Sequence, residues 1–276
     1  MSGRVSDAGA GRRARWHARI ARAHALAGES SSAGQLLTFY AALAERQRDL
    51  LESCPNPLAA DGRAFRDALD LEPALAAIPK FLSWLTSHGP TSLAESAGTL
   101  QQLDAVDWLE AMRVHMADEA DPVDDAQHAI EFVVAAVLQP LAEDLAVARG
   151  VASSAGDEPV CPVCAGAPVV GVLREEGHGG RRALVCSFCL TEHGYRRVVC
   201  PACREERFEA LPVFRSDTFA HVRIDACDTC RTYIKTIDLT KDGLAEPIVD
   251  DIATVTLDLW ARERGYQRLR TNLLRL

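Results

Sequence analysis

Eight of the nine cysteines in this 276-residue chain stand in four C-x-x-C pairs. The pairs are Cys161/Cys164, Cys186/Cys189, Cys200/Cys203 and Cys227/Cys230. One C-x-x-C turn presents two thiolates, and a second turn on a neighbouring hairpin completes a tetrahedral set of four sulfur ligands. The eight cysteines are therefore predicted to be metal ligands, and they supply two complete sets of four.

The spacing of the pairs predicts which of them share a metal. There are 21 residues between the first two pairs and 23 between the last two, whereas only 10 separate the second from the third. The longer intervals leave room for a hairpin to return, so the simplest arrangement joins the first pair with the second and the third with the fourth. An interleaved arrangement, first with third and second with fourth, remains open.

Ligation by four sulfurs suits zinc and iron alike, so the two predicted ions are structural zinc or iron in rubredoxin-like sites. A thiol-redox motif is a weaker interpretation, because thioredoxin-type pairs occur singly in a βαβ context and here every pair has a counterpart. The histidines of this region, His178, His193 and His221, are not needed as ligands. Cys54 is expected to be an unpaired thiol at the end of a helix.

Composition and charge narrow the function classes. The chain is 48% hydrophobic and 25% charged, as in globular proteins of one large or two medium domains. A net charge of −9 and an aromatic content of 6% disfavour nucleic acid as the main partner, since that binding relies on basic surfaces and stacking. No apolar run approaches the roughly 20 residues that span a bilayer, and Arg12-Arg13 is not followed by the apolar core of an export signal. We therefore expect a cytoplasmic protein.

Cysteine usage divides the chain into two regions, which together predict an α+β fold. Residues 1–156 are predicted to form an all-helical domain, with the small and polar stretch 151–159 as a linker. Residues 157–276 are predicted to contain two tandem rubredoxin-like or zinc-ribbon modules, at about 159–195 and 196–240. A closing helix is predicted over 247–264.

Hydrophobic periodicity and turn residues place the individual elements. The predicted helices cover 15–27, 33–51, 73–88, a shorter segment after Thr91, 104–118 and 121–149, the last kinked or split by Pro140. In the cysteine-rich region, β-branched or alternating stretches predict short strands over 169–173, 183–186, 196–200, 221–224 and 233–237. Gly265 is expected to end the closing helix.

The order of these features resembles the FdhE family, the formate dehydrogenase accessory proteins of bacteria. The resemblance rests on motifs as well as on cysteine spacing, and it is more specific after Cys161 than before it. The matching segments are C-P-V-C at 161–164, C-x-x-C-x-T-E at 186–192, C-x-x-C-x-x-Y-x-K at 227–235, D-D-I-A at 250–253, L-D at 257–258, G-Y-x-R at 265–268, and Asn272.

This resemblance implies an accessory protein, not an enzyme, that serves the assembly of active formate dehydrogenase. It implies that the chain binds the catalytic subunit before export and carries iron in its cysteine sites, with zinc as the alternative metal. The chain departs from the usual rubredoxin pattern after the second cysteine of each pair, where glycine is common. The residues there are Ala165, Leu190, Arg204 and Arg231, and Leu273 stands where the family often has proline.

Two other functions remain open from the residues alone. A zinc-ribbon module that binds nucleic acid would need a basic face, for which Arg181, Arg182, Arg196 and Arg197 are the candidates. A thiol-disulfide oxidoreductase acting on the client would need accessible thiols of low pKa. No phosphate-binding glycine loop, serine-nucleophile elbow or carboxylate pair is recognisable, so no catalytic residue is predicted. The pattern predicts neither the partner-binding residues nor the oligomeric state.

Overall fold

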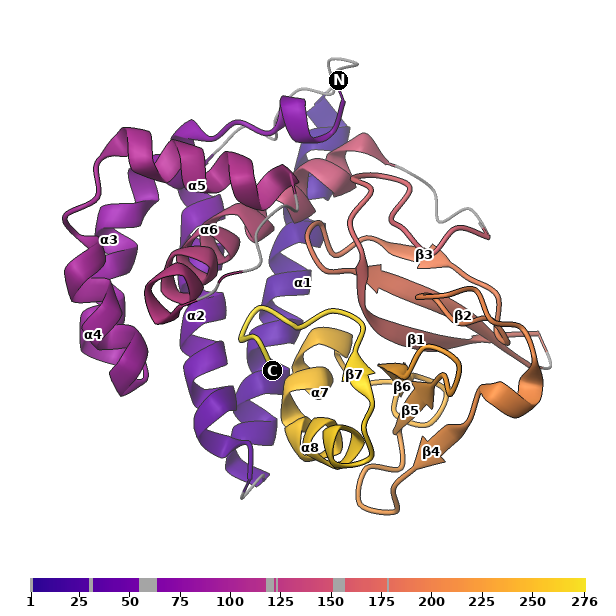
Figure 1. Ribbon diagram of the computed structural model, residues 1–276. Coiled ribbons are helices and arrows are strands. Elements are labelled where there is room, and N and C mark those ends of the chain that lie inside the picture. The colour runs from indigo at the N-terminus through magenta and orange to yellow at the C-terminus, as the bar shows by residue number, and fades with distance from the viewer. Residues whose placement is uncertain are drawn as a thin grey trace. The chain divides into compact units, whose positions relative to one another are not determined.

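The computed structural model describes residues 2–29, 32–54, 64–117, 122, 124–150, 157–177 and 179–276 (Figure 1). Its contacts divide the chain into two compact units, residues 1–17 with 39–150 and residues 18–38 with 151–276. The second unit thus takes in a segment of the N-terminal region, which no feature of the sequence indicated. Residues 151–156 of the predicted linker lie outside the described part of the chain.

The predicted helices of the N-terminal region are present. They are α1 (Ser2–Glu29), α2 (Gly34–Ser53), α3 (Glu72–His88), α4 (Thr91–Leu100), α5 (Ala105–Ala117) and α6 (Asp125–Arg149), with a short 3-10 turn, η1, at Arg66–Ala68. Asp124 caps α6 by accepting a hydrogen bond from the backbone N–H of Gln127, whereas the predicted start at Asp121 lies outside the described residues. None of the helices in the described residues is long and apolar enough to cross a membrane.

Helix α6 continues through Pro140 as one element, so the proline does not split it. Proline lacks the N–H that would bond the carbonyl four residues earlier, which here is that of Ala136. The buried side chain of Gln47, on α2, donates to that carbonyl at 2.8 Å. A partner from outside the helix therefore satisfies the group that the proline leaves free.

A single sheet runs through the cysteine-rich region. Its strands are β1 (Pro168–Glu176), β2 (Gly179–Cys186), β3 (Glu192–Gly194), β4 (Val213–Arg215), β5 (Val222–Ala226), β6 (Thr232–Asp238) and β7 (Gln267–Arg268), and a 3-10 turn, η2, covers Phe208–Ala210. The strand order is β3-β2-β1-β6-β5-β4, with β7 paired to β6. Each half is a three-stranded antiparallel ribbon, and the parallel pair β1–β6 joins the two halves.

One predicted strand is wrong. Residues 196–200 form a turn, and the strand that pairs with β2 is β3, a few residues earlier. The buried guanidinium of Arg182 explains the turn, because its Nη1 donates to the carbonyls of Arg196 at 3.3 Å and Val199 at 3.1 Å. These two carbonyls are thereby turned toward a side chain and away from a strand partner.

The predicted closing helix is two helices, α7 (Pro247–Ala253) and α8 (Val255–Glu263), which pack against β1, β6 and β7 (Figure 1). The break falls at Thr254, whose hydroxyl donates back to the carbonyl of Asp250 at 2.8 Å. Such a bond competes with regular helix geometry. Gly265, with φ of 76°, follows the end of α8 as predicted. The sheet face under these helices is apolar around Ile224 and Tyr233.

Candidate functional site

The eight paired cysteines gather into two groups of four, Cys161/Cys164/Cys186/Cys189 and Cys200/Cys203/Cys227/Cys230. The first pair joins the second and the third joins the fourth, so the tandem arrangement is confirmed. The sulfurs of Cys164 and Cys186 lie 3.3 Å apart, and those of Cys200 and Cys230 lie 3.7 Å apart. Four sulfurs at about 2.3 Å from one tetrahedral metal ion lie about 3.8 Å from one another, whereas a disulfide brings two sulfurs to about 2 Å. Each group therefore has the donor set and the spacing of a metal site.

All four C-x-x-C turns share one backbone conformation. In each, the N–H of the first cysteine donates to the carbonyl five residues later, that of Gly166, Thr191, Glu205 or Thr232, at 2.9–3.1 Å. Backbone N–H groups also point at sulfur, with Val163 N to Cys161 Sγ, Phe188 N to Cys186 Sγ and Ala202 N to Cys200 Sγ each at 3.4 Å. The repeated turn is what directs two sulfurs of every pair to the same point.

The four residues in the usual glycine position adopt the conformation that glycine would adopt. Ala165, Leu190, Arg204 and Arg231 have φ of 61°, 54°, 63° and 58°. The left-handed region costs a non-glycine residue roughly 1–2 kcal/mol. All four residues accept this cost at equivalent places, so the departure from glycine leaves the rubredoxin-like turn intact.

The four thiols of the first group lie close enough to shift the pKa of one another. Hydrogen bonds from Cys164, Cys186 and Cys189 hold the pKa of Cys161 far below its ordinary value. The contact with Cys161, together with burial, raises the pKa of Cys189. Neighbouring thiolates repel one another, and a metal cation bound by the four sulfurs would offset that repulsion and allow all four to ligate.

Gly166 makes the first group possible by its lack of a side chain. A Cβ at this position would lie 2.9 Å from Cys186 Sγ and 3.3 Å from Cys164 Sγ. The backbone thus approaches the sulfurs more closely than any other residue type would permit. The sequence offered one signal, a glycine two residues after a C-x-x-C pair, which we did not single out.

We predict that Gly166→Ala weakens metal retention by the first group, because the added methyl must push two sulfurs apart at an overpacking cost of about 1–3 kcal/mol. Retention is measured as metal per chain during competition with a chelator. The matched control is Gly243→Ala, since a Cβ there meets nothing within 4 Å. Equal retention by the two variants would contradict the assigned role of Gly166.

The two groups differ in their access to solvent. The cysteines of the first group are all buried, none more than 4% exposed. In the second group Cys203 is exposed and Cys230 is half-buried. Burial raises the pKa of Cys230, but hydrogen bonds with Thr232, Cys203 and Cys227 together outweigh it and bring the pKa to about 7. The second group is therefore the accessible one.

We predict that a chelator empties the second group first, at a rate about tenfold or more above that of the first, because the protein shell around a site controls access to it. Thiol alkylation followed by peptide mass spectrometry identifies the group that opens. Cys203 and Cys230 are expected to be labelled in the early phase. Early labelling of Cys161 and Cys164 instead would refute this order.

The remaining candidates lie apart from the two groups. His193 is buried and neither ring nitrogen has a hydrogen-bond partner among the described residues, while His221 Nε2 lies 2.7 Å from Asp250 Oδ1. His178 lies outside the described residues. Cys54 follows directly after α2 as a free thiol, as predicted.

His221, Asp242 and Asp250 also form a small group of metal-binding type. The guanidinium of Arg22, however, contacts both carboxylates at 2.6–2.7 Å and supplies the positive charge there.

Polar residues of the motifs that follow the fourth cysteine pair, from Tyr233 to Asn272, lie together in one buried network. Lys235 Nζ lies 2.6 Å from Asp258 Oδ2 and 3.1 Å from Asp251 Oδ1, and Arg268 contacts the same two carboxylates at 3.0 and 2.6 Å. Tyr233 donates to Asp258 and Asn272 donates to Asp251, each at 2.7 Å. Burial raises the pKa of Asp251, but Lys235 and Arg268 outweigh it and hold the pKa below its ordinary value. Two cations and two carboxylates thus tie α7, α8 and the C-terminal segment to β6.

The four arginines considered for a basic face do not form one. Arg182 is buried, Arg196 pairs with Glu206 at 2.7 Å, and Arg181 lies 4.0 Å from Glu176. Only Arg197 remains exposed without an ion pair among the described residues. The structure therefore does not offer the arginine surface that nucleic-acid binding through these residues would need.

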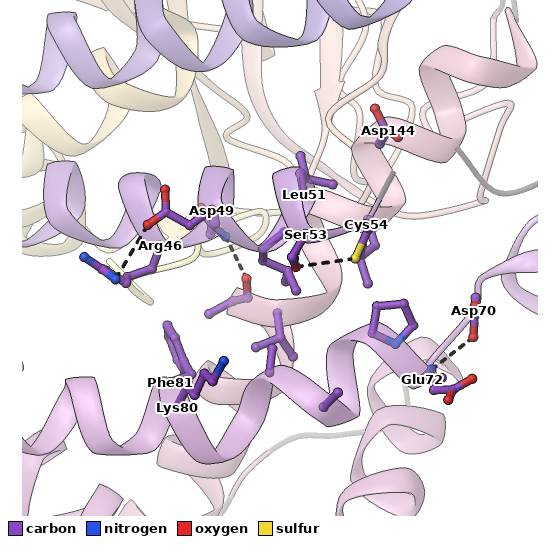
Figure 2. A pocket seen from close by; sticks show the side chains of 18 of the residues that line it. Arg46, Asp49, Leu51, Ser53, Cys54, Asp70, Glu72, Lys80, Phe81 and Asp144 are labelled. Atoms are coloured by element: carbon purple, nitrogen blue, oxygen red, sulfur yellow. Dashed lines mark hydrogen bonds and ion pairs between the residues drawn. The ribbon is translucent and has the colours of Figure 1, made fainter. Parts of the chain in front are cut away.

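In the first unit, a cavity of about 740 Å³ lies between α2, α3 and α6 (Figure 2). Leu50, Phe81, Trp84, Val137 and Leu141 contribute its apolar lining. Figure 2 shows the ion pair of Arg46 with Asp49 on one side, and Lys80 and Phe81 on the opposite helix. Asp144, which also lines the cavity, is paired with Arg12. The cavity therefore offers mainly apolar surface.

Two family models and several known proteins match this sequence. A model described as the central domain of FdhE matches residues 160–197, and one described as the C-terminal domain of FdhE matches residues 198–275. A protein FdhE homolog of Aquifex aeolicus is 33% identical over 206 residues, which are 74% of this chain and 71% of that protein. A protein FdhE homolog of Shewanella oneidensis is 36% identical over 117 residues, 42% of this chain and 38% of that protein.

The fold is also that of a solved structure. The crystal structure of the FdhE protein from Pseudomonas aeruginosa matches with a TM-score of 0.72, covering 94% of this chain and 95% of that chain at 23% identity. The arrangement of helices and sheet is thus shared along nearly the whole length. Together with the identity to the Aquifex protein over most of its length, these matches show that the chain belongs to the FdhE family.

Proposed function

We propose that this protein is a cytoplasmic maturation factor for formate dehydrogenase, which binds the catalytic subunit before that subunit is exported. Family membership supports the role, and the observation that carries it is the pair of four-cysteine groups on one sheet. In this proposal the protein acts by binding and not by catalysis. The thiols, its most reactive groups, are taken up as metal ligands.

The eight cysteines, in their two groups, would hold two metal ions. Iron is favoured by resemblance to rubredoxin-type sites, and zinc is the alternative. The backbone N–H groups that face Cys161, Cys186 and Cys200 favour the thiolate charge that either metal needs. Metal analysis with a visible absorption spectrum separates the two, because ferric iron bound by thiolates absorbs strongly and zinc, with a filled d shell, does not.

The test of the role is a pull-down of the tagged full-length protein from cells that express formate dehydrogenase, with mass spectrometry of what is bound. We expect enrichment of the catalytic subunit. Loss of that enrichment when Cys203 and Cys230 are changed to serine would place recognition on the cysteine-rich unit. The matched control is Cys54→Ser, which removes a thiol outside both groups.

The other outcomes separate the alternatives. Enrichment that survives the cysteine changes would move recognition to the helical unit, whose apolar cavity between α2, α3 and α6 is then the next surface to mutate. Recovery of nucleic acid without the subunit would contradict the proposal. So would rapid titration of several thiols in the metal-loaded protein, which the oxidoreductase alternative requires.

A further inference from the structure

The face of the sheet opposite α7 and α8 carries charged groups beside an apolar cluster of Leu184, Tyr195, Val199 and Ile234. Side chains two residues apart on a strand share a face, and residues paired across strands lie side by side. In the register, Arg215 pairs with Arg223, Arg223 with Thr236 and Thr236 with Gly171. The next row holds Asp238, Leu173 and Arg182. The alternate residues of β6, Tyr233 and Lys235, face the closing helices instead.

A cleft of about 490 Å³ opens on this face. Its lining brings three arginines together from separate segments: Arg197 from the turn before the third cysteine pair, Arg215 from β4 and Arg223 from β5. Leu173, Glu175, Asp238, Thr240 and two glycines complete it. The volume lies within the range of small-molecule sites, about 300–1,000 Å³.

The arginines of the cleft outnumber the carboxylates that neutralise them. Asp225 is shared by two buried arginines, with Arg223 Nε at 2.8 Å from Oδ1 and Arg182 Nη2 at 3.4 Å from Oδ2. Within the part of the chain that the structure describes, Arg182 has no hydrogen-bond partner at Nε. Burial lowers the pKa of Arg182, Asp225 raises it, and Arg223 lowers it again. The single carboxylate of Asp225 is therefore shared between two guanidinium groups, of which that of Arg223 also lines the cleft.

The mouth of the cleft adds further positive charge. Arg197 and Arg215 are exposed, and neither makes an ion pair with any described residue. The lining also holds two groups of opposite charge, the carboxylates of Glu175 and Asp238. Asp238 accepts hydrogen bonds from the backbone N–H and hydroxyl of Thr240. The lining thus holds three cations, Arg197, Arg215 and Arg223, and two anions, Glu175 and Asp238.

We propose that this cleft is a binding site for a small molecule that carries a phosphate or carboxylate group. Guanidinium groups present paired N–H donors whose geometry matches two oxygens of either group, and bonds between charged partners are the stronger ones. The ligand would place its anionic group between Arg197, Arg215 and Arg223 and balance the excess charge. The inference rests on the cleft alone and stands whether or not formate dehydrogenase is the client.

The test is calorimetric titration of the full-length, metal-loaded protein with sodium phosphate and, separately, with sodium acetate, at one fixed ionic strength. We expect saturable binding at one site per chain for at least one of the two anions. Arg197→Gln together with Arg215→Gln is expected to weaken it by about tenfold or more, since a bond to a charged group is lost at each position. Both side chains are exposed, so the fold does not depend on them.

The matched control is Arg13→Gln with Arg262→Gln, which removes the same charge from two exposed helix positions outside the cleft. Its binding is expected to equal that of the unmodified protein. Saturation by phosphate identifies a phosphorylated ligand, and saturation by acetate alone identifies a carboxylate. Failure of both anions to saturate, unchanged binding in the cleft variant, or an equal loss in the control would each overturn the proposal.

Discussion

Replacing Cys161 and Cys164 together with serine is expected to remove one of the two metal ions and to unfold most of the second unit. The four sulfurs of the first group are buried, and they connect the loop before β1 to the end of β2. Metal binding to such a structural site contributes an apparent free energy of about 10–16 kcal/mol to folding, which exceeds the total stability of about 5–15 kcal/mol of an ordinary domain. Metal per chain and the thermal unfolding curve measure the two effects.

The control for this variant is Cys54→Ser, which lies outside both groups and should keep two metal ions per chain and an unchanged unfolding curve. Cys203→Ser with Cys230→Ser gives a graded comparison, because that group is partly open to water and its loss should cost less structure. Full folding of the Cys161/Cys164 variant with two metals bound would show that the first group is not a metal site.

The two four-cysteine groups could be predicted from the sequence because their determinant is local. A C-x-x-C turn fixes two sulfurs whatever surrounds it, so four pairs and their intervals were enough to predict the tandem pairing. The same local signals predicted the helices, since capping residues, prolines and periodicity act over a few positions. Even the unusual residues after each pair, such as Ala165 and Arg204, follow the turn and not their own preference.

What the sequence did not indicate depends on contacts between distant segments. The two modules share one sheet through β1 and β6, a pairing between residues about 65 apart in the chain that no turn encodes. The strand predicted over 196–200 failed because Arg182 takes the carbonyls that a strand partner would need. Likewise, Gln47 satisfies the carbonyl that Pro140 frees, and nothing near Pro140 in the sequence marks this.

The burial of Lys235 and Arg268 was likewise not predictable from the sequence. Both belong to motifs shared with the FdhE family, but lysine and arginine usually lie on the surface, and composition alone would place these two there. The structure buries Lys235 completely and sets it against Asp251 and Asp258. The charges therefore serve to fix α7 and α8 on the sheet, a role that only the assembled structure reveals.

Lys235→Met is expected to lower the free energy of unfolding of the metal-loaded protein by about 3–5 kcal/mol, the usual cost of removing one partner from a buried ion pair. Methionine nearly matches the volume of the lysine chain, so the loss reports charge and not a cavity. Arg268 alone would then face two buried carboxylates, Asp251 and Asp258. Unfolding in urea, followed by circular dichroism, measures the change.

The second variant, Lys235→Met with Asp258→Leu, removes one charge of each sign and leaves Arg268 paired with Asp251. Its loss of stability is expected to be smaller than the sum of the two single losses, because the remaining pair is balanced. Lys241→Met is the surface control, since Lys241 is exposed and donates only to the carbonyl of Ala220. If Lys235→Met behaved like Lys241→Met, the network would contribute nothing to stability, and the charges buried beneath α7 and α8 would require another explanation.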